Sequence, residues 1–335
     1  MTTLAIIGGG IAGRSLLYAL SSHHFKYEEI LFFDSPEFAT PCAFNSTAIV
    51  APRGVSAGHS PLGDLILEGF ATFKQHCEFD RPAGVFPISQ FTGAISKLDQ
   101  FAKRYPLGSK VKNLGSIKLK EAVYFAEEEA FMIDPALYLP WLSSEAEKKI
   151  CIRPIRDFVI GFDKEASTIM TQNKQKYAVD HVVFATGSMS KHWRNLSAHP
   201  KLNSSKAIQG SYLEFSHIHW ELPTFSITLE GCNLIYRKHS AKVLIGSSTD
   251  DFPHELAPVH ELRKIYHLLA NTLELKLPEF HLGEIIVGHR EKAQKREPYL
   301  FTEGNVSFMG GFYKNGYSLS LRQSRSLVDQ LHELV

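Results

Sequence analysis

LAIIGGGIAGRSLLYAL, residues Leu4 to Leu20, joins a short apolar run to a segment whose apolar residues follow helical spacing. Three glycines at the spacing GxGxxG, namely Gly8, Gly10 and Gly13, lie where the two meet. Gly8 permits a sharp turn out of a strand, Gly10 lets a pyrophosphate approach the backbone, and Gly13 lets the helix pack closely. The order of strand, tight turn and helix therefore predicts a dinucleotide site with the phosphates at the helix N-terminus.

A second apolar run supports this interpretation. EEILFFD ends at Asp34, about twenty residues after the last glycine, where a carboxylate accepts hydrogen bonds from a ribose. The alternative is an ordinary strand, turn and helix followed by a chance acidic residue. The combination of fingerprint, strand and carboxylate favours the nucleotide site.

The composition is typical of a globular protein with one large or two moderate domains. The chain has 335 residues, of which 44% are hydrophobic and 21% charged. Lysines and arginines number 36 against 35 acidic residues, which argues against a general polyanion binder but leaves a local basic patch open. The four cysteines lie far apart without a CxxC pair, so we expect no disulfide framework and no metal site. No apolar run is long enough to span a membrane, and we expect a cytoplasmic protein whose oligomeric state is left open.

Two patterns of secondary structure alternate along the chain. Strand and helix alternate at both ends and around DHVVFATGS, whereas GSYLEF, TFSITL and NLIYR are typical of antiparallel strands. DPALYLPWLSSEAEKK predicts a helix with Asp134 as its N-cap and an interruption at Pro140. We therefore predict an α/β fold in which a Rossmann-type domain is interleaved with an antiparallel-sheet substrate domain. The first comprises residues 1–80, 145–203 and 286–335, and the second comprises residues 81–144 and 204–285.

Several motifs together resemble a known family. The FAD-dependent amine oxidoreductases of the D-amino-acid oxidase family contain motifs similar, in order and spacing, to IIGGGIAG, DHVVFATGS, KVLIGSST, VGHRE and FMGGFYKNGYSLS. The closing GGFYKNG resembles the glycine oxidase branch. FNSTAIVAPRG and FATFKQHCEFD resemble the flavin module of the bifunctional enzyme that modifies the wobble uridine of tRNA. The resemblance implies a non-covalently bound FAD whose ring lies between the two domains, so the first domain is expected to be the FAD-binding one.

A large set of residues is expected to contact FAD. By resemblance, residues 45–47 would meet the pyrophosphate or the ring, Gly187 would pass near the cofactor, and residues 311–316 would border the pyrimidine edge of the flavin. A helix beginning near Tyr317 would point its N–H groups and positive dipole end at a reduced, anionic flavin. The residues expected to bind FAD are Gly8, Gly10, Ile11, Ala12, Gly13, Asp34, Ser35, Asn45, Ser46, Thr47, Gly187, Gly311, Phe312, Tyr313, Lys314, Asn315, Gly316 and Tyr317.

Three residues are candidates for the substrate site. Arg290 falls at the arginine that clamps the substrate carboxylate in glycine oxidase and its relatives, and a guanidinium can bind both carboxylate oxygens at once. The alternative is a structural arginine that bridges a strand and a loop. Lys314 would neutralise a reduced flavin or contact an anionic substrate, or else face solvent. Tyr313 would wall the flavin ring or fill the core.

The sequence departs from the family pattern around these candidates. Glu291 follows the arginine where the family usually has proline, and KRE precedes the final proline in place of an aspartate-glycine pair. Leu234 replaces a tyrosine of the carboxylate site, with Tyr236 nearby, and Gln209 stands where a basic residue is common. The identity of the substrate is therefore left open.

The predicted function is an FAD-dependent oxidation of the carbon-nitrogen bond of an amine, with hydride transfer to flavin N5 and hydrolysis of the imine. The substrate is a glycine-like or secondary amino acid, or a carboxymethylaminomethyl group on a tRNA wobble uridine. In the tRNA case, the basic stretches KRYPLGSKVKNLGSIKLK and HREKAQKR would meet phosphates. The alternatives are a catalytically decayed flavin-binding or RNA-associated protein and, less favoured, an NAD-dependent dehydrogenase.

Overall fold

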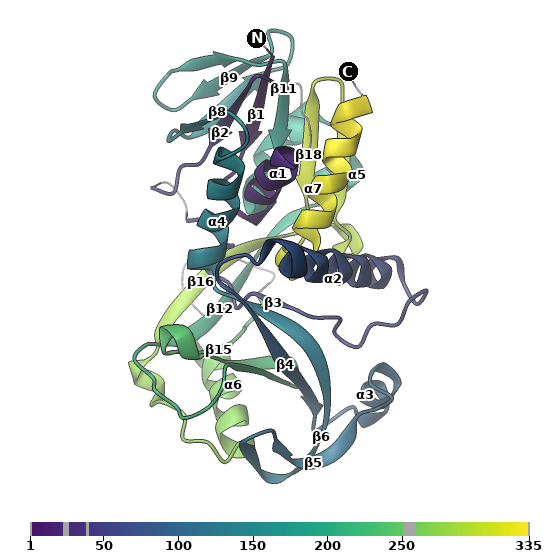
Figure 1. The fold of residues 1–335 in the computed structure, drawn as a ribbon, viewed down its shortest axis with the longest axis vertical. Helices are drawn as coiled ribbons and strands as arrows, with labels where there is room; N and C mark the ends of the chain where they lie inside the picture. The colour runs from purple at the N-terminus through teal and green to yellow at the C-terminus, as the bar shows by residue number, and fades with distance from the viewer. Residues whose placement is uncertain (1, 23–26, 38–39, 251–258, 334–335) are drawn as a thin grey trace.

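The computed structural model describes residues 2–22, 27–37, 40–250 and 259–333. In Figure 1 the two main sheets lie one above the other along the long axis, and helix α2 crosses between them. The helices are α1 (Ile11–Ser21), α2 (Pro61–Asp80), α3 (Leu98–Arg104), α4 (Pro135–Glu147), α5 (Pro200–Asn203), α6 (Val259–Thr272) and α7 (Gly316–Glu333), with short 3-10 helices η1 (Gly187–Leu196), η2 (Lys238–Ser240), η3 (Phe280–Leu282) and η4 (Gln294–Arg296).

The strands are β1 (Thr3–Ile7), β2 (Glu29–Phe33), β3 (Ile49–Val50), β4 (Val85–Ala94), β5 (Ser109–Leu114), β6 (Ile117–Ile133), β7 (Ile152–Ile155), β8 (Val159–Asp163), β9 (Thr168–Thr171), β10 (Lys176–Ala178), β11 (His181–Phe184), β12 (Lys206–Phe215), β13 (Phe225–Leu229), β14 (Cys232–Arg237), β15 (Lys242–Gly246), β16 (Glu284–Lys292), β17 (Tyr299–Glu303) and β18 (Val306–Gly310).

The first sheet has six strands in the order β17-β18-β11-β1-β2-β7, and all of its pairs except β17 with β18 are parallel. Parallel sheets are normally covered on both faces, which explains why β1 is a nearly continuous apolar run. Leu4 and Ile6 pack with α1, α4 and α7, whereas Ala5 and Ile7 pack on the side of β8 and β9. The side chains on both faces of β1 are therefore buried in the hydrophobic core.

The predicted glycine turn forms between β1 and α1. Gly8 has φ +120°, and a Cβ there would lie 2.4 Å from the carbonyl oxygen of Ala185. A Cβ at Gly13 would lie 2.0 Å from the carbonyl oxygen of Gly8, so the helix contacts the turn too closely for any side chain at that position. The predicted strand, tight turn and helix are confirmed at both glycines.

The second sheet has nine strands, in the order β16-β12-β15-β14-β13-β4-β6-β3 with β5 paired to β6. Its pairs are antiparallel except for β13 with β4. One face packs against α6, where Leu262 and Leu269 meet the apolar side chains of β12 and β14. The predicted α/β fold, with a parallel Rossmann-type sheet and an antiparallel sheet, is confirmed. No helix in the described ranges is long and apolar enough to cross a membrane.

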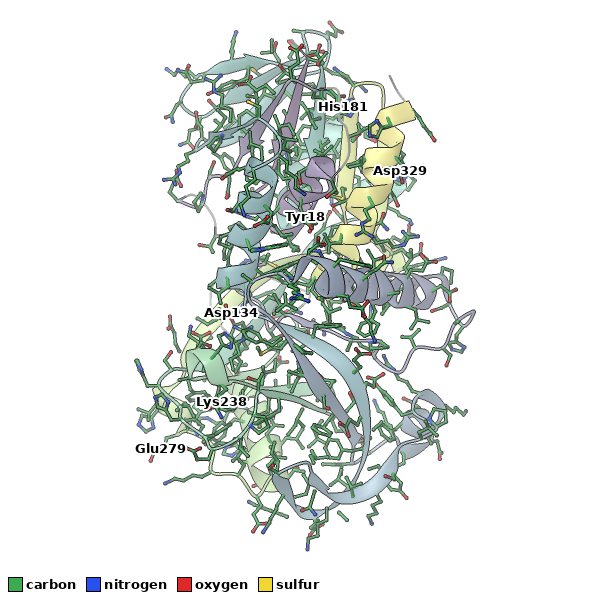
Figure 2. The ribbon with its side chains drawn as sticks, in the orientation of Figure 1. Tyr18, Asp134, His181, Lys238, Glu279 and Asp329 are labelled. Atoms are coloured by element: carbon green, nitrogen blue, oxygen red, sulfur yellow. The ribbon has the colours of Figure 1, made fainter. Side chains whose placement is uncertain are left out.

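Helix α4 agrees with one local prediction and contradicts another. Asp134 is its N-cap, since the carboxylate accepts a hydrogen bond from the Ala136 N–H at 3.1 Å. The same carboxylate contacts His239 at 2.8 Å, and Figure 2 places Asp134 between the two halves of the molecule. The predicted interruption at Pro140 is wrong, because the helix runs through it. The carbonyl that the proline leaves without a donor belongs to Ala136, an exposed residue that water can reach.

The proposed domain boundaries stay a prediction, and two elements lie across them. β16, whose residues from 286 onward were assigned to the FAD-binding domain, pairs along its length with β12 in the nine-stranded sheet. α4 begins in the predicted substrate domain but packs against α1. A strand pattern records burial on its faces and does not record which sheet provides its partner.

The crossing of α2 and α7 depends on a glycine. A Cβ at Gly69 would lie 2.4 Å from the backbone oxygen of Ser318. Helix propensity alone favours alanine at this position by about 1 kcal/mol. We expect the opposite result, because Gly69→Ala should force the helices apart and lower the free energy of unfolding by about 1–3 kcal/mol in equilibrium denaturation.

The matched control is Gln75→Ala, an exposed change in the same helix. It should alter stability by less than about 0.5 kcal/mol. A Gly69→Ala protein more stable than the wild type would show that α7 moves aside at no cost.

Candidate active site

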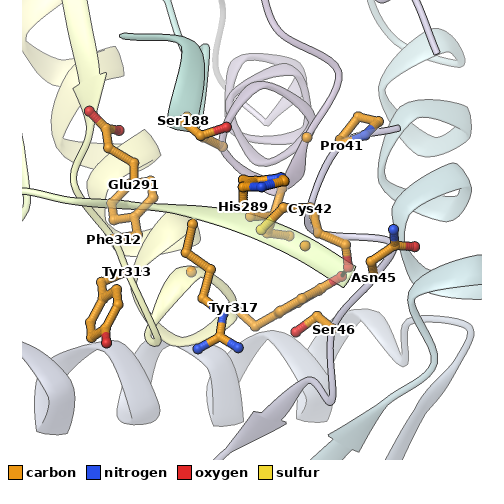
Figure 3. Close-up of a pocket in the computed structure, with 18 of the residues that line it drawn as sticks. Pro41, Cys42, Asn45, Ser46, Ser188, His289, Glu291, Phe312, Tyr313 and Tyr317 are labelled. Carbon is orange, nitrogen blue, oxygen red and sulfur yellow. Dashed lines mark hydrogen bonds between the residues drawn. The ribbon is translucent and has the colours of Figure 1, made fainter. Parts of the chain in front are cut away.

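A cavity of about 1130 Å³ lies where the carboxyl ends of β1 and β2 meet the nine-stranded sheet (Figure 3). Its volume is slightly above the range of about 300–1,000 Å³ that is usual for small-molecule sites, and an extended dinucleotide requires a large cavity. The predicted FAD residues in its wall are Gly8, Gly10, Ile11, Ala12, Asp34, Ser35, Asn45, Ser46, Thr47, Gly187, Phe312, Tyr313, Lys314, Gly316 and Tyr317.

Three predicted FAD residues lie behind this wall. Gly13 packs on the backbone of Gly8, and Gly311 donates its N–H to Glu291 at 2.8 Å. Asn315 is buried and donates its backbone N–H to the Phe312 oxygen at 2.9 Å. These three residues therefore contact the backbone of the turns around the cavity and stabilise them from behind.

The nucleotide end of the cavity fits FAD. Helix α1 begins after Gly10 without any side-chain cap, so the N–H groups of its first turn are free to bind a phosphate. A Cβ at Gly10 would meet nothing closer than Pro41 at 3.7 Å, and a Cβ at Gly187 would meet nothing within 4 Å. The residues therefore leave an open cradle with backbone donors along one side.

Asp34 is held at this end by an arginine that the sequence analysis missed. Arg14 donates to Oδ2 of Asp34 at 2.6 Å, and its other donors bind the Gly9 oxygen and the Ser143 hydroxyl. The carboxylate lies so close to the glycine turn that a Cβ at Gly9 would lie 1.9 Å from its Cγ. Arg14 thus fixes the carboxylate and occupies one of its two oxygens.

The loop of residues 40–47 connects the two halves of the cavity. Asn45 donates from its side chain to the Val287 oxygen at 3.0 Å, and Tyr317 donates its hydroxyl to the Ala43 oxygen at 2.7 Å. The Ser46 hydroxyl accepts the N–H of Ala48. These side chains hold the loop against β16 and α7, so contacts from them to FAD stay a prediction.

Arg290 lies on β16 with its side chain across the neighbouring strand β12. A Cβ at Gly210 would lie 1.9 Å from its Nη2, so the guanidinium occupies the space that a side chain on β12 would fill. Its guanidinium makes a long hydrogen bond from Nη2 to the Ser247 hydroxyl at 3.4 Å. Among the described carboxylates none forms an ion pair with it, which leaves the guanidinium available for a carboxylate ligand.

Tyr313 and Lys314 lie beside Arg290 at the edge of the cavity. Lys314 keeps contact with solvent, and its Nζ lies 5.6 Å from the centre of the Tyr313 ring. Lys292 Nζ lies 5.7 Å and Arg296 Cζ lies 6.0 Å from the centre of the same ring. Tyr313 is therefore the aromatic centre of a cationic group and is only partly buried.

Glu291 points away from Arg290, as successive residues of a strand do. Its carboxyl accepts hydrogen bonds from the Tyr299 hydroxyl at 2.5 Å and from the Gly311 N–H at 2.8 Å. Burial raises the pKa of Glu291, and these two donors oppose the rise. The residue that replaces the usual proline thus connects β16 to the turn after β18.

The other departures from the family pattern lie outside the cavity wall. Leu234 and Tyr236 are fully buried in the core beneath the sheet, where the Tyr236 hydroxyl bonds the backbone of Trp220 at 3.1 Å. Gln209 is buried and pairs through its backbone with Asp250. Tyr236 therefore does not substitute for the missing tyrosine.

The sequence analysis did not identify the polar residues at the far end of the cavity. Gln90 donates to the Thr228 hydroxyl at 2.8 Å, which donates to Asn233 at 2.7 Å. Arg53 and Glu128 line the same end. Alternation along β4 places Gln90 on one face, but only the assembled sheet shows that this face borders the cavity.

Gly210 gives a test of the position of Arg290. Gly210→Ala should displace the guanidinium and weaken binding of acetate or glycolate by about tenfold, because a charge-assisted hydrogen bond contributes about 1.5 kcal/mol. Titration calorimetry of the purified protein measures this. Ser211→Ala, on the opposite face of the same strand, is the control and should leave the affinity within about twofold. Equal affinity of Gly210→Ala and the wild type would show that Arg290 does not bind the anion.

Comparisons with known proteins agree with this geometry. A model of the family described as "FAD dependent oxidoreductase" matches residues 3–328. Glycine oxidase from Geobacillus kaustophilus has 15% identity and a TM-score of 0.76, covering 99% of this chain and 95% of its own. Iminodiacetate oxidase from Chelativorans sp. has 15% identity and a TM-score of 0.75, covering 98% and 95%.

Amadoriase I, the fructosyl amine:oxygen oxidoreductase of Aspergillus fumigatus, has 12% identity and a TM-score of 0.74, covering 100% of this chain and 87% of its own. A search of curated sequences gives no match. Because the family match covers nearly the whole chain, this protein belongs to the family of FAD-dependent oxidoreductases, and FAD is its cofactor.

Proposed function

We propose that this protein oxidises the carbon-nitrogen bond of an amine that carries a carboxylate. The observation that carries the proposal is the guanidinium of Arg290, which lacks a carboxylate partner among the described residues and lies in the cavity that holds the nucleotide cradle. When bound, FAD supplies the acceptor for the hydride that leaves the carbon beside the nitrogen.

Arg290 positions the substrate. A guanidinium binds both oxygens of a carboxylate, which fixes the adjacent carbon in place and in orientation. The nearby positive charge of Arg290 and Lys314 also disfavours a protonated amine. The neutral amine that oxidation requires is therefore favoured in the site.

Helix α7 supports the cofactor side of the reaction. Its first residues, Gly316 and Tyr317, line the cavity, so the positive end of the helix dipole faces the ligand. Phe312 and Tyr317 add apolar wall that excludes water. These groups favour negative charge on a ligand bound before the helix.

The similar structures named above are a glycine oxidase, an iminodiacetate oxidase and a fructosyl amine:oxygen oxidoreductase, which supports an amine substrate. The tRNA alternative is included as one arm of the test. The decayed alternative predicts bound FAD that no amine reduces.

The first test is the visible spectrum of the purified protein under anaerobic conditions. We expect the absorbance of oxidised flavin to bleach with at least one of glycine, sarcosine, iminodiacetate, proline or undermodified tRNA. Arg290→Ala should retain FAD and lose at least about a hundredfold in kcat/KM for a carboxylate-bearing substrate. Arg322→Ala, which removes a surface arginine paired with Glu68, is the control and should retain activity.

Two results would contradict the proposal. Full activity of Arg290→Ala would remove this residue from the site. A yellow protein that none of the amines bleaches would favour the decayed alternative.

Lys314 predicts a pH dependence of carboxylate binding. Burial, and then the positive charges of Arg290, Arg53, Arg296 and Lys292, lower the pKa of Lys314 to about 8. Lys314 is therefore charged below this pH and neutral above it. We expect the affinity for glycolate to be highest below pH 8 and to fall about fivefold as the pH rises through that value, since one partly exposed charge contributes about 1 kcal/mol.

The change in flavin absorbance on adding glycolate, recorded from about pH 6 to pH 10, gives the dissociation constants. Lys314→Met should remove the step and give the low affinity throughout. Lys314→Arg should keep the high affinity throughout, because arginine does not deprotonate in this range. An unchanged step in Lys314→Met would assign it to another group.

A further inference from the structure

We propose that the cavity contains a second anion subsite, formed by Arg53 with Lys314 beyond Arg290, and that the substrate is a dicarboxylic amine; this rests on the function proposed above. Arg53 follows the loop of residues 40–47 and lines the cavity. Its Nη2 lies 3.3 Å from the backbone oxygen of Lys314, which places the guanidinium beside the segment that carries Tyr313 and Lys314.

The charges at this end of the cavity are unbalanced. Arg53, Arg104, Arg290 and Lys314 all line it, and among the described residues no carboxylate forms an ion pair with any of them. Like charges held together in a partly buried site repel each other, so the arrangement is favourable only when a ligand supplies negative charge.

The nearby carboxyl groups offset only part of that charge. Glu128 accepts from the Gly54 N–H at 2.6 Å and from the Tyr105 hydroxyl at 3.4 Å. Burial raises the pKa of Glu128, whereas these two donors and the positive charges of Arg104 and Arg53 lower it. Glu291 is bonded to Tyr299 and to the backbone of the turn after β18. Glu128 therefore offsets part of the charge of Arg53 and Arg104, but one carboxyl does not balance the four cations that line this part of the cavity.

One carboxylate and the cofactor do not account for the excess either. A single carboxylate has two oxygens, and a guanidinium in the bidentate arrangement takes both, which would leave Arg53 without an anion. The N–H groups at the start of α1 form a separate cradle for the pyrophosphate. A reduced flavin near α7 would draw on Lys314, so Arg53 is the centre of the proposed subsite.

Contacts within the protein fix the backbone conformation around Arg53 before any ligand binds. Arg53 has φ +59° and Gly54 has φ +61°, both in the left-handed region. Arg104 donates from Nε to the Arg53 oxygen at 2.6 Å, and a Cβ at Gly54 would lie 2.5 Å from the Tyr105 ring. A strained backbone persists only where its surroundings hold it, and such positions occur preferentially at binding sites.

The experiment compares monocarboxylic and dicarboxylic ligands on the holoenzyme. Binding of acetate, malonate, succinate and glutarate is measured from the change in flavin absorbance, and kcat/KM is measured with glycine, sarcosine, iminodiacetate, aspartate and glutamate. We expect at least one dicarboxylate of this series to bind at least tenfold more tightly than acetate. The matching amine should exceed glycine in kcat/KM by a similar factor.

Arg53→Gln should lose this preference, with at least a tenfold loss for the dicarboxylate and less than a twofold change for acetate. Arg53→Lys should retain part of the preference. Lys103→Gln removes a charge from an exposed position on α3, and it should match the wild type. FAD content and melting temperature are recorded for each variant.

Two results would overturn the second subsite: wild-type protein that binds every dicarboxylate no better than acetate, or an Arg53→Gln protein that loses both classes of ligand equally. If Arg53→Gln does not fold, the wild-type series and Arg53→Lys decide. Because the binding series needs no turnover, a dicarboxylate preference that depends on Arg53 in a protein that no amine bleaches would support the subsite and refute the amine oxidation.

Discussion

The buried carboxyl of Glu291 fixes how the two sheets meet. It lies on the edge strand of the nine-stranded sheet, but both of its donors belong to the other half, the hydroxyl of Tyr299 on β17 and the N–H of Gly311 in the turn before α7. If the sheets moved apart, the buried carboxyl would lose a hydrogen-bond donor without gaining water in its place. That loss is unfavourable, so these two hydrogen bonds resist separation of the sheets. The distance between the start of α1 and Arg290 on β16 therefore depends on the hydrogen bonds of Glu291.

The hydrogen bonds of Glu291 also determine which way Arg290 points, because successive side chains of a strand alternate between its two faces. Because Glu291 points to one side of β16, Arg290 must point to the other, toward the cavity. A shift of β16 by one residue would exchange the two and bury the guanidinium. Glu291 therefore sets the register in which Arg290 faces the cavity.

The turn after Glu291 shows a second adjustment. Lys295 has φ +54° and Arg296 has φ +61°, a left-handed pair within the KRE stretch. Each costs about 1 kcal/mol relative to glycine. The conformation is retained, with Arg296 donating its N–H to the Ala293 oxygen at 3.0 Å and its guanidinium beside the Tyr313 ring. Arg296 adds positive charge near Lys314.

Local patterns in the sequence were sufficient for the fold and for bringing most of the candidate residues to one cavity. The glycine turn follows from spacing alone, whereas Arg290 was predicted from motif order and lines that cavity, and its role stays a prediction. Leu234 and Tyr236 are two residues apart and must share a face, but whether that face borders the cavity or α6 is decided by a register that spans the sheet. The role of Arg53 could not be predicted from the sequence for a different reason. Its left-handed backbone conformation depends on contacts from α3, about fifty residues away.

The two ends of the cavity use different electrostatics, and this links recognition to reactivity. Backbone dipoles serve the phosphates at α1, whereas full charges on Arg53, Arg290 and Lys314 surround the proposed substrate position. Those charges lower the pKa of a bound amine, and each carboxylate on the substrate raises it again. A monocarboxylic amine would leave positive charge uncompensated, at a cost to binding. A dicarboxylic amine would offset it, at a cost to the neutral form of its nitrogen. In the proposed reaction the same cations would therefore set both which amine binds and what fraction of it is ready to react.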